Sequence, residues 1–156
     1  LSLAFEGAFA SVVATDVSRE ALEVARRNRD AVQLEGRVDL RVGSLFEPLT
    51  PDERFDVIVS NPPYVPEDEE PSIQPEVRDW EPRGALFAGA DGLDVLRRLA
   101  AEARTHLKFD GLLALEVGFG QAKTVAEMLH NEGGFDRVRI VRDYSRKERF
   151  VLGHGV

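Results

Sequence analysis

The stretch FDVIVSNPPYVPED, residues 55–68, begins as a nearly continuous apolar run and changes abruptly at Asn-Pro-Pro-Tyr. An apolar run of this length, bounded by turn residues, predicts a buried strand over residues 55–60. Asn-Pro and Pro-Pro are turn signals, and proline fixes the backbone angle φ. Residues 61–64 can therefore be read as a rigid loop with a packed tyrosine, but this reading does not explain why the prolines stand directly at a strand end.

The segments around this stretch alternate between strand and helix patterns. Such alternation is typical of the α/β class, in which helices cover a mostly parallel sheet. The turn-like YSRKE joins the last two strands, which we expect to form an antiparallel pair at the sheet edge. The predicted strands are 11–17, 37–43, 55–60, 111–118, 137–143 and 149–154. Three helices are predicted: one follows Ser18, which caps it, one runs from a cap at Asp91 to about Lys108, and one covers about 120–132.

Residues 61–90 carry most of the prolines and the acidic run at 67–70, and are predicted to form a long ordered loop. Loops of this length inside a compact domain are usually functional.

Composition narrows the class of protein. The 156 residues fit one domain, and no apolar run approaches the ~20 residues that a membrane helix needs. A net charge of −8 argues against a general affinity for nucleic acid, although the basic residues within 137–149 form either a solvated edge or a surface for RNA or an acidic partner.

The chain has no cysteine, so disulfides and thiolate nucleophiles are excluded, and its N-terminus is not signal-like, which is typical of a cytoplasmic protein. The three histidines are scattered, so no metal site is expected.

Ligands of open α/β sheets bind beyond the carboxyl ends of the strands. Asp16 closes the first predicted strand, where an acid can accept hydrogen bonds from both hydroxyls of a nucleoside ribose. Asp16 could equally help to cap the helix that follows Ser18. Ser44 and Leu45 follow the second strand, and Leu45 could lie against an adenine or belong to the core.

The residues Asn61-Pro62-Pro63-Tyr64 suit the binding of a planar NH2 group. The stiff tetrapeptide lets the side-chain carbonyl of Asn61 and the backbone carbonyl of Pro62 accept one hydrogen each, while Tyr64 stacks on the face of the group. An amide nitrogen is a poor nucleophile, and this grip aims its out-of-plane face at an electrophile. The arrangement suits methyl transfer from a sulfonium donor, for which no strong base is needed.

Asn-Pro-Pro-Tyr at a strand end resembles the motif of class I S-adenosylmethionine-dependent methyltransferases that modify the NH2 groups of adenine, cytosine or glutamine. The surrounding segments resemble the HemK/PrmC-type protein-glutamine methyltransferases, which act on the Gly-Gly-Gln motif of peptide chain release factors, the proteins of translation termination. EVRDWEP and GADGL point to this branch, and the similarity covers essentially the whole chain. The segments that carry it are VVATDVSREALEVARRN, GSLFEPL, VSNPPYVPE, PEVRDWEPRGALFAGADGLDVLRRL and GLLALEVGFGQ.

The resemblance implies a Rossmann-like sheet, S-adenosylmethionine as cofactor and a release factor as protein partner, with no direct nucleic-acid or membrane partner. It places Asp16 at the cofactor ribose and Leu45 beside the adenine. Ser44 stands where family members often carry an acid for the adenine amino group. The resemblance makes four residues catalytic and substrate-binding: Asn61, Pro62, Pro63 and Tyr64. Asn61 would also touch the cofactor. Glu81 and Pro82 would lie in the wall of the substrate pocket.

The chain departs from the family pattern at its start. Family members carry a first strand, a turn of the kind Asp-x-Gly-x-Gly-x-Gly and an N-terminal helical domain, all before a helix that ends near LSLAF. We therefore expect residues 1–156 to be a partial catalytic domain whose sheet has a gap beside the strand at 55–60. Three alternatives remain: a ribosomal-protein glutamine methyltransferase, a non-catalytic fragment of such an enzyme, and a nucleic-acid amino methyltransferase.

Overall fold

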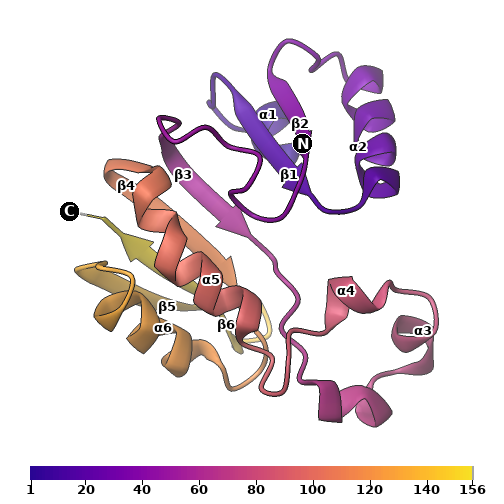
Figure 1. Ribbon diagram of the computed structural model, residues 1–156, viewed down its shortest axis with the longest axis vertical. Coiled ribbons are helices and arrows are strands. Elements are labelled where there is room, and N and C mark those ends of the chain that lie inside the picture. Colours follow the sequence, from indigo (N-terminus) through magenta and orange to yellow (C-terminus); the bar gives the residue numbers. More distant parts are fainter. Residues whose placement is uncertain (156) are drawn as a thin grey trace. The chain divides into compact units, whose positions relative to one another are not determined.

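The computed structural model describes residues 1–155 and divides into two compact units, residues 1–51 and the residues from Asp52 onward (Figure 1). Each unit combines strands with helices. The predicted α/β class is confirmed, and the strands form two separate sheets, one in each unit.

The first unit is built on two parallel strands, β1 (Val12–Asp16) and β2 (Val38–Val42), which pair from Val12↔Val38 to Asp16↔Val42. Helix α2 (Arg19–Ala31) connects them and packs on both. The predicted cap is confirmed, because the hydroxyl of Ser18 accepts a hydrogen bond from the backbone N–H of Ala21 at 3.0 Å. The short helix α1 (Ser2–Glu6) contributes Ala4 to a small core with Leu34 and Val38.

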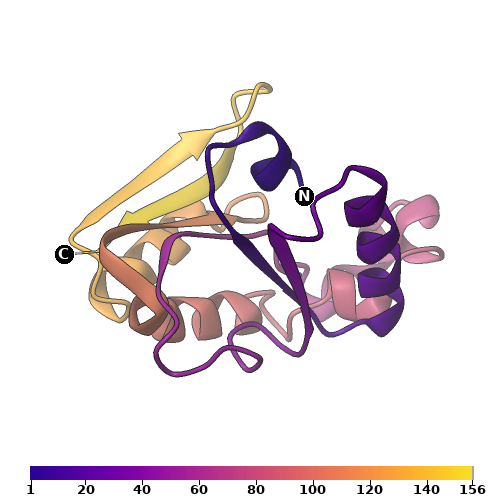
Figure 2. The same ribbon diagram turned by 90° about the horizontal axis from the view of Figure 1, so that it is seen from above.

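The second unit holds a four-stranded sheet in the order β3-β4-β6-β5. Its strands are β3 (Phe55–Ser60), β4 (Leu107–Glu116), β5 (Arg137–Arg142) and β6 (Glu148–His154). β3 and β4 are parallel, whereas β6 is antiparallel to both of its neighbours, as the long C-terminal strand pair in Figure 2 shows. Three strands therefore run one way and only β6 runs the other way, which confirms the mostly parallel sheet with an antiparallel C-terminal pair.

Two helices cover one face of this sheet (Figure 1). Helix α6 (Ala122–Asn131) packs on β5 and β6, and helix α5 (Asp94–Glu102) packs beside α6. Leu113, Leu115 and Phe135 are each 0% exposed in the core of this unit. None of the helices within residues 1–155 is long and apolar enough to cross a membrane.

Strand β3 pairs with β4 along one edge and with no other strand among residues 1–155. Strand β1 likewise pairs only with β2 within that range. Within residues 1–155, β3 is therefore an edge strand of its sheet, as expected from the predicted gap beside residues 55–60.

Two predicted segments differ from the structure. Residues 61–90 are not a simple loop, because they contain the 3-10 helix η1 (Glu67–Ser72) and the short helices α3 (Pro75–Arg78) and α4 (Arg83–Leu86). The helix predicted from Asp91 to Lys108 is shorter: α5 begins at Asp94 and is followed by the 3-10 helix η2 (Ala103–His106). The carboxylate of Asp91 instead accepts a hydrogen bond from the backbone N–H of Leu93, one turn before the helix begins.

Strand β4 begins four residues earlier than predicted because it contains an irregularity. Asp110 has a φ of +57°, and the pairing of β4 with β3 shifts register between Phe55↔Leu107 and Val57↔Leu112. A bulge of this kind leaves extra residues unpaired without ending the strand. The sequence Phe-Asp-Gly at the bulge has the composition of a turn, which hides the first half of the strand.

The core of the second unit gives a stability prediction. We expect Phe135→Ala to lower the free energy of unfolding by about 3–5 kcal/mol, because the ring is fully buried and its removal leaves a cavity. Phe109→Ala is the matched control, since its ring is 84% exposed and the change should stay within about 0.5 kcal/mol. Urea unfolding followed by circular dichroism measures both. Equal effects of the two substitutions would contradict this packing.

Candidate functional site

In the first unit, the carboxyl ends of β1 and β2 bring together the residues predicted to hold a nucleoside. The backbone N–H of Gly43 donates to the carbonyl of Asp16 at 3.0 Å, which continues the strand pairing by one residue. The hydroxyl of Thr15 donates to the carbonyl of Leu45 at 2.9 Å. Asp16, Ser44 and Leu45 thus gather at one edge of the small sheet, as the sequence predicts from their positions after parallel strands.

The carboxylate of Asp16 already makes one local contact. Its Oδ1 accepts a hydrogen bond from the backbone N–H of Ser18 at 2.8 Å, so the residue helps to order the start of α2. Asp16 is nevertheless exposed, and a carboxylate offers about four acceptor positions on two oxygens. The side chain can therefore serve the helix and still accept hydrogen bonds from a ligand.

Leu45 has an unusual backbone conformation. Its φ is +50°, in the left-handed region that bulky side chains rarely adopt. The bond from Thr15 to its carbonyl holds the residue there, and its side chain is half-buried. Ser44 beside it is also half-buried, and its backbone N–H donates to the carboxylate of Glu47 at 3.2 Å. Backbone outliers of this kind cluster at ligand sites, which makes Leu45 a candidate ligand contact.

In the second unit, Asn61 follows the last residue of β3. Its side chain is exposed, and no hydrogen bond to it is present within residues 1–155. Pro62 is buried, and among the same residues its backbone carbonyl accepts no hydrogen bond. Within the described part of the chain, both carbonyl groups predicted to bind an NH2 group are therefore free of donors.

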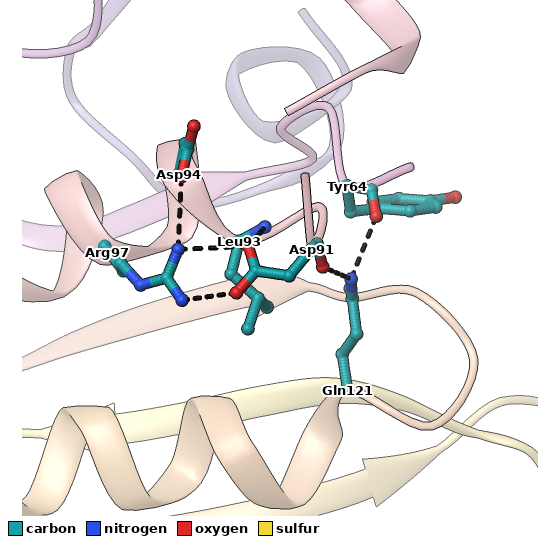
Figure 3. A network of polar contacts seen from close by, with 6 residues as sticks. All are labelled: Tyr64, Asp91, Leu93, Asp94, Arg97 and Gln121. Atoms are coloured by element: carbon teal, nitrogen blue, oxygen red, sulfur yellow. Dashed lines mark hydrogen bonds and ion pairs between the residues drawn. The ribbon is translucent and has the colours of Figure 1, made fainter. Parts of the chain in front are cut away.

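Tyr64 is held at several points. Its hydroxyl lies 3.5 Å from Oε1 of Glu116, the last residue of β4. Its backbone carbonyl accepts a hydrogen bond from the side-chain amide of Gln121 at 2.9 Å, as Figure 3 shows. Gly118 lies so close that a Cβ added there would stand 3.1 Å from the tyrosine ring. The ring is half-buried, which leaves part of it available for stacking.

Gln121 was assigned no role from the sequence. It stands in GLLALEVGFGQ, a segment that supports the family resemblance, three residues after Gly118. Its contact with Tyr64 spans 57 positions in the chain, and no local pattern reports a contact of that range. The only signal available from the sequence was its position directly after a strand end and a pair of glycines.

The turn before α5 belongs to the same contact network as Tyr64 and Gln121, which Figure 3 shows. Arg97 binds both carboxylate oxygens of Asp91, and the same guanidinium reaches Asp94 at 3.1 Å. The hydrogen bond from Arg97 is the main reason that the pKa of Asp91 lies below its ordinary value. Gly92 has a φ of +72°, and a Cβ at that position would stand 2.3 Å from the carbonyl oxygen of Tyr64. Only glycine allows this turn to approach Tyr64 so closely.

The chain between Tyr64 and this turn forms an excursion over residues 66–86, closed at its base. Val65 and Phe87 form a bridge, in which the N–H of Val65 donates to Leu86 and its carbonyl accepts from Ala88. An ion pair between Arg83 and Glu70 ties the last helix of the excursion to its first. The bridge thus fixes the two ends of this segment, and the ion pair joins its first helix to its last.

Glu81 and Pro82 lie on this excursion, between α3 and α4. Both are exposed, and Pro82 is the N-cap residue of α4. Within residues 1–155 no hydrogen bond joins them to residues 61–64. The structure therefore does not test their predicted place in the wall of a substrate pocket.

Comparison with known proteins finds similar sequences over most of the chain. A family model described as the methyltransferase small domain matches residues 1–76. Proteins named release factor glutamine methyltransferase are 41% identical over 153 residues in Clostridium acetobutylicum, 44% over 143 residues in Gloeobacter violaceus and 46% over 136 residues in Geobacter sulfurreducens. These matches cover 97%, 92% and 87% of this chain but only 53%, 50% and 47% of the relatives.

Solved structures confirm the fold. A methyltransferase from Pyrococcus furiosus has a TM-score of 0.66 at 22% identity, and the match covers 94% of this chain and 64% of that one. The T. thermophilus 16S rRNA N2 G1207 methyltransferase, solved with AdoMet and guanosine, has a TM-score of 0.70 at 20% identity over 100% of this chain and 34% of that one. The motif resemblance, the sequence matches and the fold agree. Over most of its length the chain is similar to proteins named release factor glutamine methyltransferase, and it spans about half the length of the relatives that it matches.

Proposed function

We propose that the protein methylates the side-chain amide of the glutamine in the Gly-Gly-Gln motif of peptide chain release factors, with S-adenosylmethionine as methyl donor. The observation that carries this proposal is the pair of carbonyl groups of Asn61 and Pro62 directly after β3, which accept no hydrogen bond within residues 1–155 and belong to the same tetrapeptide as Tyr64. The names of the relatives give the same substrate class. We further propose that residues 1–156 are part of a catalytic domain.

The acceptor amide would be bound by both of its hydrogens. The side-chain oxygen of Asn61 and the backbone oxygen of Pro62 each accept one, and the ring of Tyr64 covers one face of the amide plane. Pro63 holds the spacing between these groups, because its ring fixes φ. The free face of the nitrogen is then aimed at the methyl donor in a near-attack geometry.

The same two acceptors also favour the transition state over the ground state. As the new N–C bond forms, positive charge develops on the nitrogen and its hydrogens become stronger donors to Asn61 and Pro62. The methylated nitrogen then loses a proton readily, so this reaction needs no dedicated base. The cofactor, when bound, supplies an electrophilic methyl group on a sulfonium.

The first unit would hold the nucleoside part of the cofactor. The exposed carboxylate of Asp16 has acceptor capacity left for the ribose hydroxyls, and the half-buried side chain of Leu45 offers an apolar surface for the adenine. The hydroxyl of Ser44 can accept from the adenine amino group, although one hydroxyl is a weaker partner than the acid found in many relatives.

We propose that the excursion over residues 66–86, with Glu81 and Pro82 exposed between its helices, contacts the protein substrate. Exposed Trp80 beside them offers a large apolar side chain for such a contact. A release factor works together with the ribosome, so the proposed substrate implies a cytoplasmic location.

Methyl transfer tests the proposal directly. We expect the protein to transfer the labelled methyl group of S-adenosylmethionine to a release factor, and to lose this activity when the glutamine of Gly-Gly-Gln is changed to glutamate, because the NH2 group is gone. Scintillation counting and mass spectrometry of the modified peptide measure both. Transfer to a ribosomal-protein glutamine or to a nucleic-acid base, with none to the release factor, would reject this substrate.

Asn61 gives the sharpest test of the mechanism. Asn61→Ala should lower kcat at least about 100-fold, on the scale of losing one donor or acceptor that serves the transition state, with the fold retained because the side chain is exposed and makes no internal hydrogen bond. Asn131→Ala at the exposed end of α6 is the matched control and should be silent. Turnover of the Asn61 variant at the wild-type rate would refute the role of the amide.

Asp16 can be tested so that its two roles separate. Asp16→Asn keeps an oxygen that can accept from the N–H of Ser18 but removes the charge and one ribose acceptor. If Asp16 only ordered the helix, this variant would bind S-adenosylmethionine as well as wild type does. We expect at least about tenfold weaker binding by calorimetric titration, with a smaller effect on the rate at saturating cofactor. Asp39→Ala on β2 is the control for a lost exposed carboxylate in the same unit.

A further inference from the structure

We infer that Gln121 is a positioning residue for the acceptor amide, which acts by fixing the backbone of Tyr64. This inference rests on the proposed function for its catalytic consequence, but the contact itself can be tested without activity. Both polar atoms of the Gln121 side-chain amide form hydrogen bonds. Its Nε2 donates to the carbonyl of Tyr64 at 2.9 Å, and its Oε1 accepts from the backbone N–H of Gly118 at 2.9 Å.

The side chain does not serve its own helix. Gln121 is the N-cap residue of α6, yet its side chain makes no cap hydrogen bond. The start of the helix is ordered by the backbone, where the N–H of Val125 donates to the carbonyl of Gln121 at 3.0 Å. The polar atoms of the side chain instead bind the segment after β3, the turn before α5 and the turn after β4. Figure 3 shows the contacts of Nε2 with the carbonyls of Tyr64 and Asp91.

The space around this amide is kept free by two glycines. A Cβ at Gly118 would stand 2.7 Å from Oε1 of Gln121, and a Cβ at Gly92 would stand 2.9 Å from Nε2 and 2.3 Å from the carbonyl oxygen of Tyr64. Contacts under 3.0 Å would force one of the partners to move. Glycines in two separate segments of the chain therefore leave room for the side chain of Gln121 and its hydrogen bond to Tyr64.

The requirement is specific to glutamine. The two contacts need one donor and one acceptor at the end of a side chain of this length. Glutamate has the same shape but offers only acceptors, so one of its oxygens would face the carbonyl oxygen of Tyr64. Asparagine is one methylene shorter and cannot span the two contacts.

The position of Tyr64 matters because only Pro63 separates it from the carbonyl of Pro62. Proline fixes φ, so a rotation of the backbone at Tyr64 is transmitted to the orientation of both the ring and the Pro62 carbonyl. Misplacement of reacting groups by about 1 Å can cost about 100-fold in rate. Loss of the Gln121 contact should therefore lower kcat more than it changes the KM for the cofactor, whose predicted nucleoside contacts Asp16, Ser44 and Leu45 lie in the first unit.

The test compares Gln121→Glu with Gln33→Glu, the same chemical change at an exposed turn. The protein contains two tyrosines, and Tyr144 is fully exposed. Labelling with 3-fluorotyrosine therefore gives two fluorine resonances, and that of Tyr144 is an internal reference. We expect the Tyr64 resonance to shift in Gln121→Glu and in Gln121→Met, but not in Gln33→Glu, with circular dichroism unchanged in all three. We also expect kcat to fall at least about tenfold for both Gln121 variants.

The outcomes separate this inference from the proposed function. An unmoved Tyr64 resonance in the Gln121 variants would overturn the inference whether or not the protein is active. A shifted resonance with wild-type kcat would overturn the positioning role. A wild-type protein that methylates no release factor would reject the proposed function, and the fluorine spectra would still decide whether Gln121 holds Tyr64.

Discussion

One primary amide joins the segments on which the candidate acceptor site depends. The sheet places the ends of β3 and β4 side by side, since Ser60 and Leu115 pair in parallel register. The pairing of the two strands ends there and does not fix where residues 61–64 lie. The side chain of Gln121 supplies one restraint by binding the segment after β3 from the turn after β4, in addition to the contact of the Tyr64 hydroxyl with Glu116. The turn at Asp91, held by Arg97, closes around the same point.

Sequence reasoning succeeded where the signal is local. The strand at 55–60 has the predicted bounds, and Ser18 caps α2 as its position before an amphipathic run indicates. It failed where tertiary contacts decide. The first half of β4 contains a left-handed Asp110 in a turn-like sequence, and only pairing with β3 makes it a strand. The short helices of residues 61–90 were missed because each spans too few residues to show a helical period.

Some residues of the candidate site could likewise be predicted from local sequence patterns, and others could not. The strand-end positions of Asp16, Leu45 and Asn61 follow from alternation and turn chemistry, so these residues could be named from the sequence. Gln121 could not be named, because its role is a contact between segments 57 positions apart. Asp16 also shows that a structural and a functional reading of one residue need not exclude each other. One oxygen orders the helix while the exposed carboxylate keeps capacity for a ligand.

The closed base of the excursion over residues 66–86 has a consequence for how such a protein can change over time. Because the Val65–Phe87 bridge fixes where the segment leaves and where it returns, its interior can be lengthened, shortened or replaced without moving Tyr64 or the turn at Gly92. If the proposed function holds, the contacts with the protein substrate and the groups that bind the acceptor amide lie in separable parts of one chain. Exchange of the residues between the two ends of the bridge would then change the partner and leave residues 61–64 in place.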